Sequence, residues 1–123
     1  MTAAILVTGA REWTDEKLVY DTLLPYKNTK YILIHGDCVG LDKIAGKIAN
    51  EIGLIVQTYP ADWKKFGKSA GPKRNKQMID ELLKYNTKIM FAFHDAIDKS
   101  KGTLNCINQA KKVNITCTII SHR

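Results

Sequence analysis

The sequence predicts an α/β fold: a Rossmann-like three-layer domain in which helices flank a mostly parallel, five-stranded sheet. Short and nearly continuous apolar runs alternate along the chain with longer segments whose apolar residues recur every three or four positions. Continuous runs are typical of strands buried on both faces, and their alternation with helices favours parallel pairing through right-handed crossovers. Since 123 residues suffice for one domain of this kind, a single domain over 1–123 is expected.

The predicted strands are short segments rich in aliphatic and aromatic residues. The first is expected to stop at a glycine-bearing turn, residues 8–11, and the second at the polar segment 35–42. All but the last are followed by a segment with helical spacing, as β-α units require. The predicted strands are residues 4–7, 31–34, 54–56, 88–93 and 115–120.

Amphipathic helices are expected between these strands. The first begins with Thr14 as its N-cap, followed by two acidic residues, and ends before Pro25. The second carries aliphatic residues on one face and stops at Gly53. The last two helices are predicted over about 73–85 and about 102–113.

Composition limits the partners and the compartment. Nineteen Lys and Arg against twelve Asp and Glu give a formal charge of +7, which favours an anionic partner. The three cysteines, Cys38, Cys106 and Cys117, form no CxxC pair, so we expect reduced thiols, a cytoplasmic protein, and neither metal nor cofactor. No signal peptide and no run of about twenty apolar residues is found, so no membrane partner is expected.

The loops after the strands are the candidate site, because ligands of open parallel sheets bind outside the carboxyl ends of the strands. The best phosphate-binding corner is Gly102-Thr103, beside Lys101, at the start of the last helix. Backbone N–H groups, a hydroxyl and the positive end of the helix dipole favour an anion there. A Gly-Thr pair is also a good helix cap, so the pair alone does not indicate a ligand. Its position after a buried strand is what favours a ligand contact.

Two acids and two glycines follow the second strand in the pattern Gly36-Asp37-x-x-Gly40-x-Asp42. Carboxylates in this place suit the hydroxyls of a ribose, and the glycines keep the turn tight. The alternative interpretation is a capped helix that starts near Asp42, and the two are compatible. His35 and His94 each end a predicted strand, where a structural role is the commoner one.

A basic and aromatic stretch, residues 63–76, overlaps the longest predicted loop, residues 61–72. Trp63 interleaved with lysines suits stacking on a base while phosphates are neutralised, although a solvated basic face explains the lysines equally well. Arg74 is the stronger candidate, since its planar fork matches a phosphate. Neither a Walker A motif nor the GxGxxG fingerprint is present.

A series of motifs along nearly the whole chain resembles one known family. The motifs are Thr8-Gly9-x-Arg11, His35-Gly36-x-x-x-Gly40-x-Asp42, Pro60-Ala61-x-Trp63, Ala70-Gly71-Pro72-x-Arg74-Asn75-x-x-Met78 and Gly102-Thr103. Together they are similar to the YspA-type branch of the SLOG superfamily. The resemblance implies a Rossmann-like fold and recognition of nucleotides or nucleotide-derived ligands, including ADP-ribose-like signals.

The enzymes of that superfamily, the LOG-type phosphoribohydrolases, pair an arginine with a glutamate in a Pro-Gly-Gly-x-Gly-Thr-x-x-Glu motif. The resemblance matches Arg74 to the arginine, but Cys106 occupies the glutamate position and Lys99-Ser100 stand roughly where Pro-Gly should be. Glycosidic cleavage needs a carboxylate, so the resemblance favours binding over hydrolysis.

The expected function is therefore capture of a nucleotide-derived small molecule, such as an ADP-ribose derivative or a cyclic nucleotide, by a sensor or sequestering protein. The alternative is a nucleotide hydrolase in which Arg74 holds the phosphate and Asp37 or Asp42 is the acid/base. Nucleic-acid binding driven by charge is a weaker third possibility, and a homo-oligomer is expected. The predicted ligand contacts are Gly9, Arg11, Gly36, Asp37, Gly40, Asp42, Trp63, Arg74, Asn75, Gly102 and Thr103.

Overall fold

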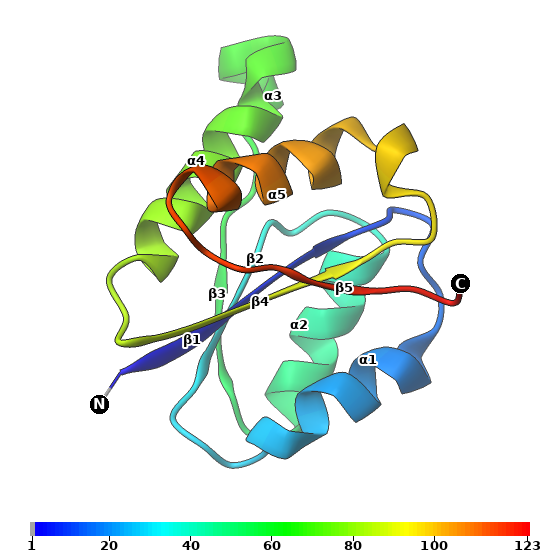
Figure 1. The fold of residues 1–123 in the computed structure, drawn as a ribbon, viewed down its shortest axis with the longest axis vertical. Helices are drawn as coiled ribbons and strands as arrows, with labels where there is room; N and C mark the ends of the chain where they lie inside the picture. Colours follow the sequence, from blue (N-terminus) through cyan, green and yellow to red (C-terminus); the bar gives the residue numbers. More distant parts are fainter. Residues whose placement is uncertain (1) are drawn as a thin grey trace.

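The computed structural model describes residues 2–123 and contains a five-stranded sheet in the order β3-β2-β1-β4-β5 (Figure 1). Every pair of neighbouring strands is parallel, which confirms the α/β, Rossmann-like prediction with a wholly parallel sheet. The strands are β1 (Ala3–Gly9), β2 (Ile32–His35), β3 (Ile55–Thr58), β4 (Thr87–Phe93) and β5 (Thr118–Ile120).

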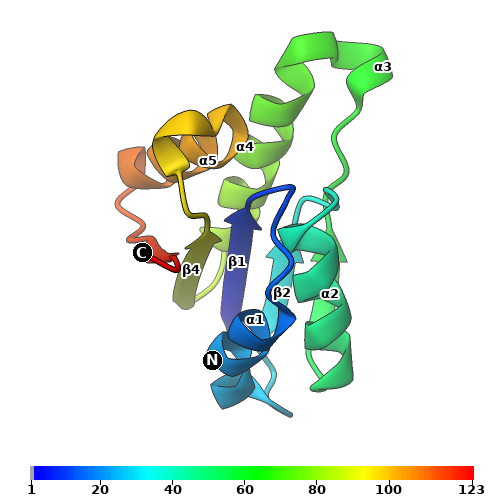
Figure 2. The ribbon, with the colours of Figure 1, turned by 90° about the vertical axis from the view of Figure 1, so that its right-hand side faces the viewer.

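Helices cover both faces of the sheet. Figure 2 shows α1 and α2 on one side of it and α4 and α5 on the other. The short α3 projects beyond the rest of the domain next to α4 (Figure 1). The helices are α1 (Glu16–Leu23), α2 (Leu41–Glu51), α3 (Trp63–Phe66), α4 (Ala70–Leu82) and α5 (Lys101–Lys112), with single 3-10 turns at Leu24–Tyr26, Gly67–Ser69 and Ile97–Lys99.

The central strand β1 supplies both halves of the core. Ile5 and Val7 pack in the cluster beneath α1 and α2, while Ala4 and Leu6 pack beneath α4 and α5. Successive side chains of a strand point to opposite faces, so a strand covered on both sides must be apolar at every position. This is why the first predicted strand is an unbroken apolar run.

The predicted loop over 61–72 is wrong, because most of it is helical. Asp62 caps α3 by accepting a hydrogen bond from the Lys65 amide at 3.1 Å, and a 3-10 turn leads directly into α4 at Ala70. Pro72 lies in the first turn of α4, where a backbone N–H has no helical partner and its loss costs little. Local helix breakers therefore obscured a helix that begins three residues before position 73.

Other boundaries also differ from the prediction: α4 ends at Leu82 and not near 85, and β5 begins at Thr118 and not at 115. The N-cap of α1 is Asp15 and not Thr14, since the Asp15 carboxylate accepts from the Leu18 amide at 3.0 Å. β1 continues through Thr8 and Gly9, which pair with Ala92 and Phe93 of β4 in place of the predicted turn. Long-range pairing thus extends the strand past the end of its apolar run.

Across residues 2–123, no helix combines the length and the apolar character that crossing a membrane requires.

Candidate functional site

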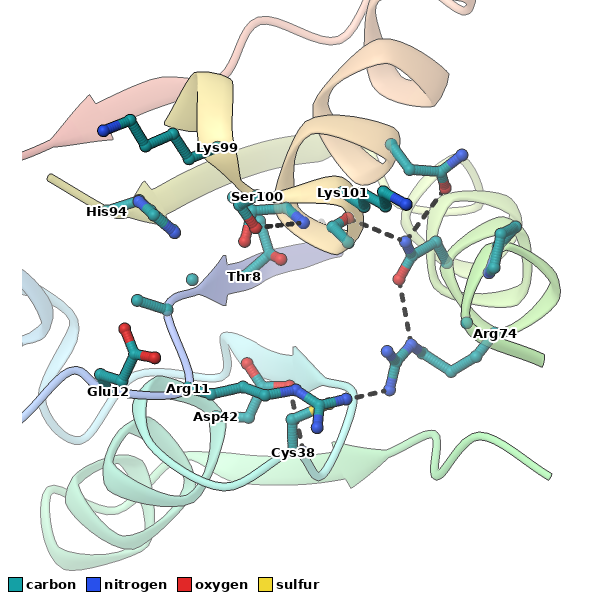
Figure 3. A pocket seen from close by; sticks show the side chains of 18 of the residues that line it. Thr8, Arg11, Glu12, Cys38, Asp42, Arg74, His94, Lys99, Ser100 and Lys101 are labelled. Carbon is teal, nitrogen blue, oxygen red and sulfur yellow. Dashed lines mark hydrogen bonds between the residues drawn. The ribbon is translucent and has the colours of Figure 1, made fainter. Parts of the chain in front are cut away.

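A cavity of about 840 Å³ opens at the carboxyl ends of β1 and β4, where the strand order reverses (Figure 3). This is the position that ligands take in open parallel sheets. Most of the predicted contacts line it: Gly9, Arg11, Asp42, Trp63, Arg74, Asn75, Gly102 and Thr103. Gly36, Asp37 and Gly40 do not line it.

The cavity wall carries an excess of positive charge. Its acidic side chains are Glu12 and Asp42. Its cationic side chains are Arg11, Lys68, Arg74, Lys99 and Lys101. A concave wall of one prevailing sign concentrates oppositely charged ligands, so an anionic ligand is favoured here.

Arg74 is buried at the cavity wall, with 8% of its surface exposed. Its Nη1 donates to the Gly36 carbonyl at 2.5 Å and its Nε to the Asn75 side-chain oxygen at 3.0 Å. Cys38 Sγ lies 3.5 Å from the same Nη1. No hydrogen-bond partner is found for Nη2 within the described residues, 2–123, so one donor of the fork is free for a ligand.

Asn75 connects Arg74 to the first turn of α5. While its oxygen accepts from Arg74, its Nδ2 donates to the Gly102 carbonyl at 3.2 Å and to the Asn105 side chain at 3.1 Å (Figure 3). Asn75 is 3% exposed, so this chain of bonds is shielded from water. The arginine and the Gly102-Thr103 corner therefore face the same cavity, as the sequence predicted.

The start of α5, where the sequence predicted a phosphate contact, lines the cavity. Ser100 is the N-cap, and its Oγ accepts from the Thr103 amide at 3.2 Å, so Gly102 and Thr103 lie inside the first turn and do not cap the helix. The amides of the first turn have no carbonyl partner within a helix. A Cβ placed on Gly102 would meet no atom within 4 Å, and its conformation does not require glycine. The open space above Gly102 is therefore cavity.

The other predicted glycines serve packing within the protein. A Cβ on Gly36 would collide with the Arg74 guanidinium. One on Gly9 would lie 2.5 Å from the Phe93 carbonyl oxygen. Gly40 has a φ of +80° and touches the backbone of Arg11. These three glycines let the segments around the cavity approach one another, and Gly36 in particular seats Arg74.

Asp42 is a buried carboxylate at the cavity wall, with 6% of its surface exposed. Its Oδ2 accepts from the amides of Gly36 at 3.1 Å and Cys38 at 3.3 Å, which fixes the segment after β2. Burial raises the pKa of Asp42 to about 6, against the opposing effects of those amides and of Arg74. The pKa of Asp42 is therefore closer to neutral pH than that of an ordinary aspartate, although the cationic Arg74 acts on it in the opposite direction.

Asp37 lies in a different place. It lines a separate hollow of about 320 Å³ beside α2 and pairs with Lys43 at 2.6 Å. The hydrogen bond from Lys43 lowers the pKa of Asp37. The structure therefore does not bring Asp37 and Asp42 together, and of these two aspartates only Asp42 lines the larger cavity.

Comparison with known proteins identifies the family of the chain. Residues 3–66, from β1 through α3, match the family described as the YspA, cpYpsA-related SLOG family. The chain belongs to this family. The gene 61 protein of Mycobacterium phage D29 is similar to it, being 30% identical over 122 residues that cover 90% of each chain. Membership of the SLOG family indicates a nucleotide-related role, in ligand binding or processing.

In this SLOG protein Cys106, which the resemblance matches to the glutamate of the LOG motif, does not line the cavity. Cys106 lies on the buried face of α5, and burial raises the pKa of its thiol to about 12. It is a small core residue and not a nucleophile. The described part of the chain also contains no cluster of His, Cys, Asp or Glu that could hold a metal ion.

The two strand-end histidines stabilise turns. Nδ1 of His35 accepts from the Asp37 amide at 2.9 Å, and Nδ1 of His94 accepts from the Ala96 amide at 2.8 Å. Burial lowers the pKa of His35. His94 also lines the cavity, which leaves its Nε2–H as a donor on that wall.

Several wall residues had no distinct signal in the sequence. They lie in loops or short turns, where polar side chains carry no periodic pattern that separates a ligand contact from a solvated residue. The one sequence signal for some of these residues is that they follow a predicted strand closely. They include Glu12, Cys38, Lys68, Lys99 and Ser100.

Proposed function

We propose that this chain binds a nucleotide-derived small molecule, an ADP-ribose-like or cyclic-nucleotide signal, and acts as a sensor or a sequestering protein. The observation that carries the proposal is the Arg74–Asn75–Gly102 connection, which aims a free guanidinium donor and a helix N-terminus at one cationic cavity. Phosphate oxygens are the group that such a pair of donors recognises best.

The rest of the cavity suits the other parts of a nucleotide. The Asp42 carboxylate, at the cavity wall, accepts from the Gly36 and Cys38 amides through Oδ2 and is suited to accept a sugar hydroxyl as well. Trp63 is half exposed at the wall, and its ring edge lies above Gly71, where a Cβ would approach to 3.3 Å. An exposed indole face at a cationic cavity suits stacking on a base.

Calorimetric titration with ADP-ribose, its cyclised derivatives and cyclic mononucleotides tests the proposal. We expect at least one of them to bind with one-site stoichiometry and to protect the thiol of Cys38, in the cavity wall, from alkylation. Mass spectrometry of small molecules that co-purify with the protein identifies the natural ligand. Absence of binding across the whole panel would argue against the proposal.

Replacing Gly102 with alanine should separate folding from binding. The methyl group meets no protein atom, and alanine favours a helix over glycine, so the free energy of unfolding should rise by about 0.5–1 kcal/mol. The same methyl group occupies the space over the first-turn amides, so the affinity of the best ligand should fall about tenfold, or about 1.4 kcal/mol. Thermal melts and calorimetry measure the two effects.

Asn108→Ala is the matched control for Gly102→Ala. Asn108 is exposed on the same helix and outside the cavity, so alanine should stabilise α5 without changing affinity. If Gly102→Ala binds as tightly as Asn108→Ala, the start of α5 does not hold the phosphate.

A nucleotide hydrolase is the second candidate function, and Asp42 is the observation in its favour. A carboxyl with a pKa of about 6 at a cationic cavity is suited to general acid or base catalysis near neutral pH. Incubation of concentrated protein with nucleoside monophosphates, followed by chromatography, decides between the functions. Release of a free base that is lost in Asp42→Asn supports the hydrolase, and unchanged nucleotides exclude it.

A further inference from the structure

Two loops that form one side of the cavity meet at the C-terminal segment of the chain. Residues 10–15, after β1, bring Arg11 and Glu12 to the wall, and residues 94–100, after β4, bring Lys99 and Ser100. The segment after β5 ends beside both loops (Figure 1). Its residue His122 does not line the cavity.

His122 contacts both loops through its ring. Nε2 lies 2.8 Å from a carboxylate oxygen of Asp15, and Nδ1 lies 2.9 Å from one of Asp95. The backbone amide of His122 also donates to Asp95 at 2.7 Å. A ring with a carboxylate at each nitrogen donates from both nitrogens only when it is an imidazolium.

The Trp13 ring, on which the His122 imidazole stacks, is held in place by its neighbours. The imidazole stacks on Trp13 at 4.8 Å between centroids with an interplanar angle of 19°. Trp13 is buried, packs edge-on against Phe93 at 5.6 Å, and donates from Nε1 to the Asp15 carbonyl at 3.0 Å. The stack therefore ties the C-terminal segment to the end of β4 as well as to the loop after β1.

We propose that His122 is a positioning residue for the cavity. Its imidazolium holds the loop of Arg11, residues 10–15, against the loop of Lys99, residues 94–100, so that the two cations face one anionic ligand. Loss of the proton removes one of the two ring donors and releases one carboxylate. The loops then become more mobile, and affinity for the anion falls. Only the consequence for affinity rests on the proposed function.

The charged groups around the ring favour its protonated form. The carboxylates of Asp15 and Asp95 raise the pKa of His122, and Lys17 acts on Asp15 from α1. A histidine with a raised pKa keeps its stabilising effect below its ordinary pKa and loses it as the pH rises through the raised value. The loops should thus be tightest in mildly acidic solution and loosen toward alkaline pH.

The contact is tested without any ligand by hydrogen exchange and fluorescence. In His122→Gln, amides within 10–15 and 94–100 should exchange about tenfold faster than in the parent protein at neutral pH. In a Trp63→Phe background, the emission of Trp13 should change with pH in the parent and lose that transition in His122→Gln. Unchanged exchange in both loops overturns the proposal.

Binding of ADP-ribose as the probe tests the consequence for the cavity. Between mildly acidic and alkaline pH, the affinity of the parent should fall about threefold to tenfold more than that of His122→Gln. His122→Arg keeps a planar cation that can stack and pair with both carboxylates, so it should remain tight at alkaline pH. The contribution of Asp42 to the profile is common to all three proteins and cancels in the comparison.

The outcomes separate this proposal from the proposed function. Identical pH profiles for the parent and His122→Gln overturn the positioning role and leave nucleotide binding intact. If the parent does not bind ADP-ribose at any pH, the exchange of the two loops decides the role of His122 by itself.

Discussion

Replacing Arg74 with alanine should weaken binding of a phosphate-bearing ligand by about 100-fold or more, since it removes a buried charged donor from the cavity. The same change leaves the Gly36 carbonyl and the Asn75 side-chain oxygen without their donor and Asp42 without its neighbouring cation. Unfolding free energy should therefore fall by about 3 kcal/mol. Calorimetry and chemical denaturation measure the two losses.

Two further variants separate the effect of the planar guanidinium from the effect of net charge and of stability. Arg74→Lys retains the charge but not the planar fork, so it should fold better than the alanine variant and still bind poorly. Lys76→Gln removes one positive charge from an exposed position on the same helix, where Lys76 pairs with Asp80. It should leave affinity nearly unchanged. Equal losses in Lys76→Gln and Arg74→Lys would mean that net charge, and not the fork of Arg74, attracts the ligand.

Asp42→Asn should make the protein more stable at alkaline pH and less able to bind. Because burial raises the pKa of Asp42 to about 6, the ionised form costs free energy in the folded state. This cost is fully present above that pKa and disappears as the pH falls from about 6 toward the ordinary value of 3.8. Asparagine removes the charge and still accepts from the Gly36 and Cys38 amides.

We expect Asp42→Asn to gain about 3 kcal/mol over the parent near pH 8 and almost nothing near pH 4. Its affinity for a nucleotide ligand should fall about tenfold, a trade of function for stability. Denaturation curves at several pH values and calorimetry at one pH check both statements. A stability difference that does not vary with pH would show that Asp42 titrates normally.

Asp37→Asn is the matched control for Asp42→Asn, because the pKa of Asp37 is shifted in the opposite direction. Its ion pair with Lys43 lowers that pKa, so the asparagine variant should lose a little stability above the ordinary range of the carboxyl and none in strong acid. Asp37 lies outside the cavity, so affinity should not change.

The layers of the fold were predictable because burial imposes a local pattern. β1 must be apolar at each position since helices cover both of its faces, and α2 must show helical spacing since one face packs on the sheet. Positions where the local signal and the long-range contacts disagree were predicted wrongly. Thr8 and Gly9 belong to a strand through pairing with β4, and α4 begins in a segment rich in helix breakers.

The chemistry of the site was predictable where one residue type suits one task. Arg74 and Gly102 follow from the need for a planar cation and for room at a helix start. Their connection did not follow, because Asn75 reaches Gly102, 27 residues further along the chain, only through the packing of α4 against α5. The role of His122 likewise depends on a contact with Asp15, 107 residues away.

The order of strands and helices along the chain, and the polar residues at the strand ends, were predicted from the sequence alone. Which of those residues share a cavity was decided only by the tertiary structure. Asp37 and Asp42 lie in one short segment, yet Asp37 adopts a φ of +59° and pairs with Lys43, while Asp42 lies in the first turn of α2 and faces Arg74. Side-chain direction at a strand end depends on backbone turns and distant neighbours, and residue types alone do not encode it.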